Sequence, residues 1–119
     1  KNYNLYKKAV DNIEGLTLLP FRNDTRANHW FYSLVVEKEK YGMNRDELLL
    51  KLNDNKIQTR PLWGLIHKQK PYLGNQGYKI EKAEFYEGNL INIPCSSNLI
   101  EEDVNIVINR LMTSSVLAL

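Results

Sequence analysis

The sequence predicts a small α+β domain in which helices pack on a mixed or antiparallel sheet. Its 119 residues fit one domain, and a chain of that length can bury enough surface for one hydrophobic core. Helical spacings and short β-branched runs alternate along the chain, which is typical of this class. Hydrophobic residues at 43% and charged residues at 25% match ordinary globular composition, so disorder is not expected.

The first part of the chain predicts a helix followed by two strands. Gly15 is placed to end the helix, and residues 16–19 form a short apolar strand that Pro20 stops. The polar residues 21–28 connect this strand to residues 29–36, where aromatic and β-branched side chains give the strongest strand signal. The i, i+3, i+4, i+7 spacing of the helix is carried by Tyr6, Ala9, Val10 and Ile13.

The middle of the chain predicts a turn, a capped helix and a strand. Residues 38–40 alternate in charge and are expected to form a solvated turn. Asn44 begins the helix, with Glu47 three residues later in the pattern of a capping box. Residues 57–60 then form a strand that ends at Pro61. The buried stripe of the helix is expected to be Leu48, Leu49 and Leu52.

The second half contains a long loop, two helices and a strand. Residues 61–77 carry two prolines and three glycines but also several aromatic side chains, so this loop is expected to line something. A helix through Ile80 and Ala83 follows, ended by Gly88, and residues 90–93 form a strand. The last helix starts near residue 100, with its buried face formed by Val104, Val107, Ile108 and Leu111.

Charge, cysteine content and hydropathy argue against several classes of protein. The 16 Lys and Arg are interspersed with the 14 Asp and Glu, so the clustered cations of a nucleic-acid binder are missing. Cys95 alone forms no internal disulfide or cysteine-rich zinc site, and we expect it to be a small buried hydrophobe. His29 has no partner at metal-ligand spacing and is expected to be structural. No membrane-length apolar run or signal peptide is present, which favours a cytoplasmic protein.

Several stretches spread over nearly the whole chain follow one family pattern. Residues 29–36 read His-Trp-Phe-Tyr-Ser-Leu-Val-Val, and residues 44–52 contain Asn-Arg-Asp-Glu-Leu-Leu. Residues 57–63 carry a Thr-Arg pair and a Trp, and residues 67–72 carry His, Gln and Tyr at fixed offsets. Ala83-Glu84, Ile93-Pro94-Cys95 and a helix at Glu101 complete the series. In this order and spacing, the stretches resemble the small domain of the DegT/DnrJ family of sugar aminotransferases.

The resemblance implies a fold-type I enzyme dependent on pyridoxal 5'-phosphate (PLP). Such enzymes transfer an amino group, usually from glutamate, to a keto-deoxysugar attached to a nucleotide, here in bacterial surface-glycan or amino-sugar synthesis. The family's members are homodimers with active sites between subunits. The Schiff-base lysine, the carboxylate facing the pyridine nitrogen and most phosphate contacts lie in the family's large N-terminal domain. No catalytic residue is therefore assigned in this chain.

The resemblance also divides the chain. The chain begins at Lys1, without Met, inside a helical pattern, so we expect the chain to have been cut from a longer protein. Residues 1–15 would be a helix joining a missing N-terminal large domain. Residues 16–113 would form the C-terminal small domain, and residues 114–119 a C-terminal tail.

Four residues match substrate-site positions of the family. His67 and Tyr72 resemble the pair that approaches the bound nucleotide-sugar, and we favour this role over one in pinning the loop to the sheet. Arg60 would meet the amino-donor carboxylate or the sugar-nucleotide, with a surface salt bridge as the equal alternative. Trp63 would stack on a base or sugar, or else lie in the core or at the domain interface.

Other matched positions have structural interpretations. Trp30 and Tyr32 would share one face of their strand and pack in the core or against the missing large domain. Ile100 stands where the family has a Thr or Ser that caps the last helix. Because Ile has no capping group, Asn98 with Glu101 is expected to form an alternative capping box.

Two alternatives to an aminotransferase stay open. Some relatives are PLP-dependent sugar dehydratases or deoxygenases in which the Schiff-base lysine is replaced, and that position lies outside this chain. The other alternative is a free-standing α+β ligand-binding module without chemistry. Such a module would be monodisperse and bind a ligand unaided, whereas an orphaned domain would expose an apolar patch and self-associate.

Overall fold

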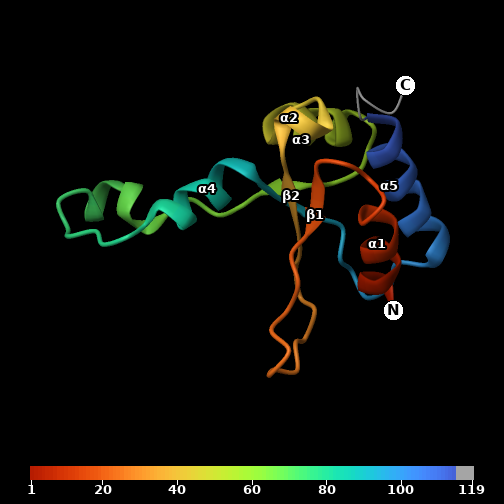
Figure 1. Ribbon diagram of the computed structural model, residues 1–119, viewed down its shortest axis with the longest axis horizontal. Helices are drawn as coiled ribbons and strands as arrows, with labels where there is room; N and C mark the ends of the chain where they lie inside the picture. The colour runs from red at the N-terminus through yellow and green to blue at the C-terminus, as the bar shows by residue number, and fades with distance from the viewer. Residues whose placement is uncertain (115–119) are drawn as a thin grey trace.

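The computed structural model describes residues 1–114 and confirms the α+β class (Figure 1). Within these residues, four strands form one antiparallel sheet in the order β1-β2-β4-β3. The strands are β1 (Leu16–Leu18), β2 (Tyr32–Val36), β3 (Arg60–Pro61) and β4 (Leu90–Ile93). The helices are α1 (Asn2–Val10), α2 (Lys38–Tyr41), α3 (Arg45–Asp54), α4 (Glu81–Asn89) and α5 (Glu101–Ser114), with 3₁₀ turns η1 (Ile66–Lys68) and η2 (Lys70–Tyr72).

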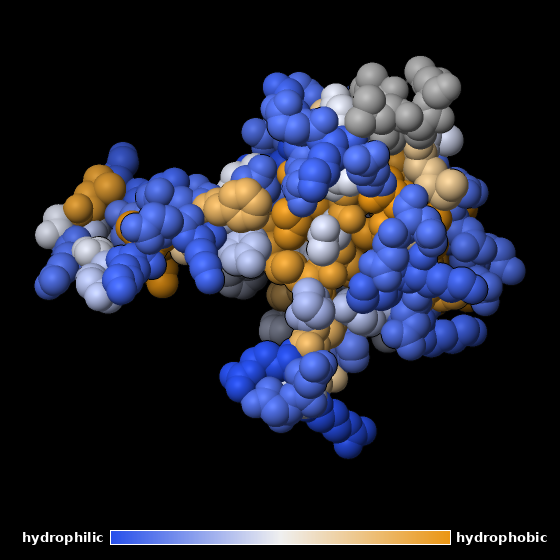
Figure 2. All heavy atoms as spheres, viewed as in Figure 1, coloured by the Kyte–Doolittle hydropathy of each residue, from blue (hydrophilic) through white to orange (hydrophobic). Residues whose placement is uncertain are grey.

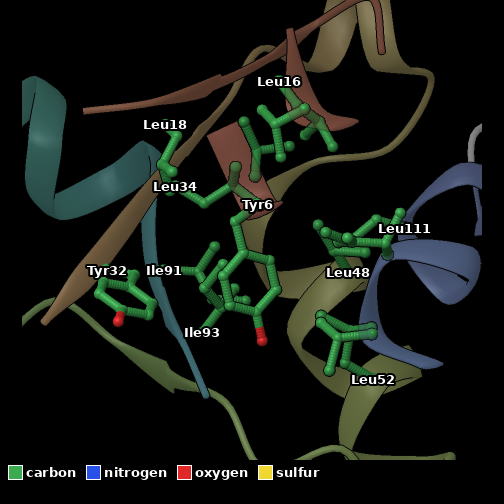
Figure 3. Close-up of a cluster of buried hydrophobic side chains, with 14 of the residues drawn as sticks. Tyr6, Leu16, Leu18, Tyr32, Leu34, Leu48, Leu52, Ile91, Ile93 and Leu111 are labelled. Carbon is green, nitrogen blue, oxygen red and sulfur yellow. The ribbon is translucent and has the colours of Figure 1, made fainter. Parts of the chain in front are cut away.

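The hydrophobic core lies between the sheet and helices α1, α3 and α5. Leu34 of β2 pairs with Leu18 of β1 and Ile91 of β4, and all three are buried. Because alternate residues of a strand share a face, the residues two positions away on each strand extend these three side chains into one apolar surface of the sheet. Figure 3 shows Tyr6 at the centre of the cluster, between the sheet and the side chains of α3. Helix α1, which contributes Tyr6 and Val10, is therefore an integral part of the core.

The connection from α1 to β1 requires glycine. Helix α1 ends at Val10, earlier than the predicted end at Gly15, and the chain then turns. Gly15 has φ 86°, and a Cβ built on it would lie 2.4 Å from the backbone nitrogen of Tyr41. Its carbonyl also accepts the N–H of Glu37 at 2.8 Å. Only glycine combines this left-handed backbone with so close an approach, which joins the start of the sheet to α2.

The predicted capping box of α3 is confirmed. The Glu47 N–H donates to Asn44 Oδ1 at 2.8 Å, and the Asn44 N–H donates to Glu47 Oε2 at 3.1 Å. This reciprocal pairing satisfies two amides at the start of the helix and fixes its first turn. The helix buries Leu48 and Leu52 completely and Leu49 partly, as its apolar stripe predicts.

The strand predicted over residues 29–36 is shorter than expected. His29 has φ 54°, a left-handed conformation that interrupts an extended strand, so β2 begins at Tyr32. Tyr32 enters the core at 7% exposure, whereas Trp30 is 68% exposed outside the sheet. The expectation that the two side chains share one strand face is therefore wrong, and Trp30 does not pack in the core.

The strand predicted over residues 57–60 is also shorter, since β3 consists of Arg60 and Pro61. Lys56 has φ 63°, which turns the chain after α3 before any strand pairing starts. Ile57 and Thr59 are nevertheless buried, and the Thr59 N–H donates to Asn53 Oδ1 at 3.2 Å. The Asn53 side chain of α3 thus fixes this segment, which is not paired with a strand of the sheet.

Three local predictions about helices are wrong. Residues 38–40 are not a simple turn but form α2 with Tyr41, whose buried hydroxyl donates to the Leu111 carbonyl at 2.6 Å. Helix α4 continues through the exposed Gly88 to residue 89. Helix α5 begins immediately after Ile100, whose N–H donates to Asp103 Oδ2 at 3.2 Å, so the expected box of Asn98 and Glu101 does not form.

Two segments project from the sheet and its helices (Figure 1). One is the loop of residues 19–31 between β1 and β2, and the other, here called the arm, comprises residues 62–89 with η1, η2 and α4. Figure 2 shows a largely polar arm beside an apolar area over the sheet. No helix within residues 1–114 is long and apolar enough to cross a membrane. Of the predicted tail, Ser114 is the last residue of α5 and residues 115–119 lie outside the described residues.

Candidate functional site

The four candidate residues lie on the segment that leaves the sheet and enters the arm. Arg60 lies in β3, where it is paired with Asn92 of β4. Trp63 follows β3 directly, His67 lies on η1 and Tyr72 ends η2. The loop over residues 61–77, which the sequence predicts to line something, therefore carries Trp63, His67 and Tyr72, and Arg60 precedes it in an edge strand of the sheet.

The first pocket, here called the edge cleft, lies beside β3 and has a volume of about 250 Å³. It combines hydrogen-bonding side chains from the sheet with the flat faces of two aromatic rings. Such a mixture suits a ligand that carries both a ring and an anionic or polar group. The cleft is lined by Phe31, Gln58, Arg60, Trp63, Asn92, Ile93, Pro94, Cys95 and Ser96.

Asn92 and Arg60 are two of the polar side chains that line the edge cleft. Ser33 Oγ lies 3.0 Å from Asn92 Oδ1 and donates to it, which fixes the Asn92 carboxamide on the sheet. Arg60 is exposed and forms no ion pair with any of residues 1–114. Its planar guanidinium, which can bind a carboxylate or phosphate through two parallel hydrogen bonds, is thus not engaged by a carboxylate of the described chain.

The second pocket, here called the arm pocket, has a volume of about 580 Å³. Trp63 lines both pockets, so the edge cleft and the arm pocket adjoin at its indole. Trp63 is 72% exposed, which excludes the core position considered from the sequence. The arm pocket is lined by Trp63, Gly64, Leu65, Ile66, His67, Tyr72, Asn75, Gln76, Gly77, Tyr78 and Ile80.

Contacts with α4 hold η1, the 3₁₀ turn of the arm that carries His67. His67 Nε2 lies 3.4 Å from Glu84 Oε1, so the imidazole is fastened to α4 and not to the sheet. Glu87 accepts the Leu65 N–H at 3.0 Å and lies 3.3 Å from Lys68 Nζ. The Leu65 N–H, together with the Lys68 ammonium, lowers the pKa of Glu87 below its ordinary value. The turn is thereby joined to α4 through two carboxylates.

Several residues of the edge cleft were not predicted from the sequence. Phe31 meets Trp63 with ring centroids 6.4 Å apart, and Asn92 interrupts an otherwise apolar strand. A polar residue within an apolar strand is a signal that its side chain faces away from the core. Gln58 gives no such signal, because it lies in an irregular segment that only the fold places beside β4.

Cys95 and His29 flank the site. Cys95 packs against the core, but it is only half-buried and lines the edge cleft, so the expected small buried hydrophobe is confirmed in part. His29 packs against Phe21, with ring centroids 4.5 Å apart, and against Tyr3 at 5.0 Å. Within residues 1–114, no three His, Cys, Asp or Glu side chains gather as they would around a metal ion.

The pockets of this chain do not by themselves fit PLP. Neither the edge cleft nor the arm pocket contains a lysine for a Schiff base or a carboxylate for a pyridine nitrogen. No lysine among residues 1–114 is buried. The two pockets therefore offer groups that can bind and orient a ligand, and no group that could form a Schiff base.

Comparison with protein families gives a match over almost the whole chain. The sequence model of the DegT/DnrJ/EryC1/StrS aminotransferase family matches residues 1–112. The chain is 30% identical over 110 residues to the spore coat polysaccharide biosynthesis protein SpsC of Bacillus subtilis. It is 25% identical over 111 residues to the putative pyridoxal phosphate-dependent aminotransferase EpsN of the same organism. These matches cover 87% and 90% of this chain but 28% of each relative.

Solved structures share the fold at low sequence identity. DesI, crystallised in the presence of its TDP-sugar product, superposes with a TM-score of 0.86 at 16% identity, over 98% of this chain and 30% of that one. The Helicobacter pylori aminotransferase PseC, involved in pseudoaminic acid biosynthesis, gives 0.80 at 20% identity, over 96% of this chain and 31% of that one. The chain thus spans less than a third of the length of these proteins.

Proposed function

Because the chain belongs to the DegT/DnrJ/EryC1/StrS aminotransferase family, we propose that it is the small domain of a PLP-dependent sugar aminotransferase. The whole protein would transfer an amino group from glutamate to a nucleotide-linked keto-deoxysugar. PLP, when bound, would act as the electron sink of this reaction. The rest of the protein would hold it, since the pockets of this chain offer no lysine.

One observation carries the proposal for this chain. Arg60, Trp63, His67 and Tyr72 surround two pockets that adjoin at the Trp63 indole. A nucleotide-sugar carries a flat base, charged phosphates and a polar sugar, and the pockets offer an aromatic face, a guanidinium, an imidazole and a phenol. The chemical groups of the pockets thus match those of a nucleotide-sugar, and they would suit binding and orientation of substrate at the mouth of an active site.

Each residue would have a distinct task. Trp63 would stack on the base or sugar, and Arg60 would bind the phosphates or the donor carboxylate. His67 and Tyr72 would hydrogen-bond to phosphate or sugar oxygens from the two 3₁₀ turns of the arm. His67 is already oriented by Glu84, whose carboxylate accepts from Nε2, so that Nδ1 of the neutral imidazole is left to accept a hydrogen bond from a sugar hydroxyl.

The wider setting belongs to the same proposal. The protein would be a cytoplasmic homodimer with active sites shared between subunits. Its small domain, residues 16–113, would pack against its own large domain. Residues 1–15 would be the joining helix, which contributes Tyr6 and Val10 to the core of the small domain, and residues 114–119 would be a tail. The product would be an amino-sugar for a bacterial surface polysaccharide, a role similar to that named for SpsC.

The test is a reaction with the full-length protein, PLP, glutamate and either a TDP-linked or a UDP-linked keto-deoxysugar. We expect one 2-oxoglutarate for each amino-sugar formed, both measured by mass spectrometry. Loss of a sugar hydroxyl without consumption of glutamate would instead indicate a dehydratase or deoxygenase. Binding of the nucleotide-sugar with neither amino transfer nor loss of a sugar hydroxyl would favour the ligand-binding module.

A further inference from the structure

Helix α4 carries two carboxylates that contact η1 and its N-cap residue. Glu84 and Glu87 are three residues apart, so they lie on the same face of the helix. Glu87 Oε2 accepts the Leu65 N–H at 3.0 Å, and its Oε1 lies 3.3 Å from Lys68 Nζ. Glu84 Oε1 lies 3.4 Å from His67 Nε2. The two carboxylates therefore contact three of the four consecutive residues that form η1 and its N-cap.

The backbone contact distinguishes this arrangement from ordinary surface ion pairs. Exposed ion pairs between side chains contribute little, because both partners remain solvated and flexible. Leu65 is the N-cap of η1, and the bond from its N–H to the Glu87 carboxylate is charge-assisted and therefore stronger than a neutral hydrogen bond. Glu87 thus fixes the origin of the turn, whereas Glu84 fixes one side chain on it.

The turn that Glu87 fixes is continuous with the rest of the candidate site. The Gln69 N–H donates to the Ile66 carbonyl at 3.0 Å, and the Tyr72 N–H donates to the Gln69 carbonyl at 2.9 Å. A shift of η1 would therefore move both His67 and Tyr72. Trp63 lies on the other side of Leu65, at the junction of the two pockets.

We propose that Glu87 and Glu84 are positioning residues, which fix η1 on α4 and so set where His67 stands at the arm pocket. The consequence for substrate rests on the proposed function, whereas the fixing of the turn does not. Neither carboxylate lines the edge cleft or the arm pocket, so neither is expected to touch a substrate bound there. Their effect would act through His67 and Tyr72.

The test compares Glu87→Ala with Glu87→Gln in the full-length protein. The alanine variant removes the acceptor for Leu65, while the glutamine variant keeps an oxygen acceptor and loses the charge. Glu81→Gln, on the same helix but exposed at its start, is the matched control. We would measure amide exchange of residues 62–72 and the KM for a TDP-linked or UDP-linked keto-deoxysugar.

In Glu87→Ala we expect faster exchange at Leu65 and about a fivefold rise in KM, the size of one lost hydrogen bond. In Glu87→Gln, Leu65 exchange and KM should both stay close to those of the unaltered protein. Glu81→Gln should change neither quantity. Glu84→Gln should leave Leu65 exchange unchanged and raise KM less, because it acts on one side chain.

Two results would overturn the inference. Unchanged exchange in Glu87→Ala would show that Glu87 does not hold the turn, whatever the kinetics. Faster exchange with an unchanged KM would show that the turn is held but does not position a substrate group. In that second case His67→Ala separates the causes. A raised KM in His67→Ala leaves the proposed function standing, and an unchanged one removes the substrate role of His67 as well.

Discussion

The Phe31 ring meets the Trp63 indole in an edge-to-face contact, at an interplanar angle of 71° and a centroid distance of 6.4 Å. Phe31 ends the loop between β1 and β2, and Trp63 begins the arm, so the contact joins the two projecting segments of the molecule. It does so at the junction of the edge cleft and the arm pocket. An indole that is 72% exposed yet oriented by a neighbouring ring is well placed to stack on a ligand.

Trp63→Ala is therefore expected to weaken binding of the nucleotide-sugar about tenfold, because stacking of a base on an aromatic side chain contributes roughly 1–3 kcal/mol. The melting temperature should change little, since the exposed indole adds little to folding. Isothermal titration calorimetry and thermal unfolding measure the two effects. Phe85→Ala is the control, because Phe85 is also an exposed aromatic residue but lines neither pocket. Equal losses in both variants would contradict the stacking role.

Arg60 gives a second prediction, about which anion the edge cleft binds. Arg60→Lys keeps the positive charge but loses the planar fork, so KM should rise about tenfold for whichever substrate uses both hydrogen bonds. Initial rates with glutamate and the nucleotide-sugar varied separately would assign the donor carboxylate or the phosphates. Arg22→Ala is the control, since Arg22 pairs with Asp24 at 2.6 Å in the loop of residues 19–31. An unchanged KM for both substrates would remove Arg60 from the site.

The order of helices and strands could be predicted because its determinants are local. The box of Asn44 and Glu47 and the apolar stripe after it specify α3 without reference to the rest of the chain. The starts of β2 and β3 could not be predicted, since nothing in the identity of His29 or Lys56 announces a positive φ. The burial of Tyr41 likewise depends on contacts with distant segments at Gly15 and α5.

The candidate site was only partly predictable for a related reason. Arg60 and His67 were selected by resemblance to a family pattern, which concerns one continuous stretch of sequence. The edge cleft instead combines side chains from three separate segments, so Phe31 and Asn92 became visible only when the sheet brought them to Trp63. The carboxylates of α4 were missed for the same reason, because their partners on η1 lie about 20 residues earlier in the chain.

The contact between Glu87 and Leu65 should depend on pH in a defined direction. The Leu65 N–H and Lys68 lower the pKa of Glu87, and His67 adds to this effect when it is protonated. The other acid facing the turn is Glu84. A carboxyl whose pKa is lower in the folded protein stabilises the fold above its unfolded pKa, and that contribution is lost as pH falls through the folded value.

The Leu65 amide proton shift, followed by NMR, should therefore change with a midpoint below the ordinary glutamate pKa of about 4.3. The change reports protonation of Glu87 and loss of the charge-assisted bond. In Glu87→Gln the same transition should disappear. A midpoint at or above the ordinary glutamate pKa would contradict the contact.

Two buried tyrosines provide the last prediction, which concerns stability. Burial raises the pKa of both Tyr6 and Tyr41, so both hydroxyls are protonated at neutral pH. Tyr41 donates to the Leu111 carbonyl at 2.6 Å, whereas the Tyr6 hydroxyl has no hydrogen-bond partner among residues 1–114. Figure 3 shows the Tyr6 ring inside the apolar cluster.

Tyr41→Phe should lower the free energy of unfolding by about 1–2 kcal/mol, because it leaves the Leu111 carbonyl without this donor. Tyr6→Phe should be neutral or raise that free energy by up to about 1 kcal/mol, since it removes a hydroxyl that is buried without compensation. Urea unfolding with an unchanged m-value measures both. If Tyr6→Phe cost as much as Tyr41→Phe, the Tyr6 hydroxyl would have to be hydrogen-bonded in solution, to an ordered water in the core.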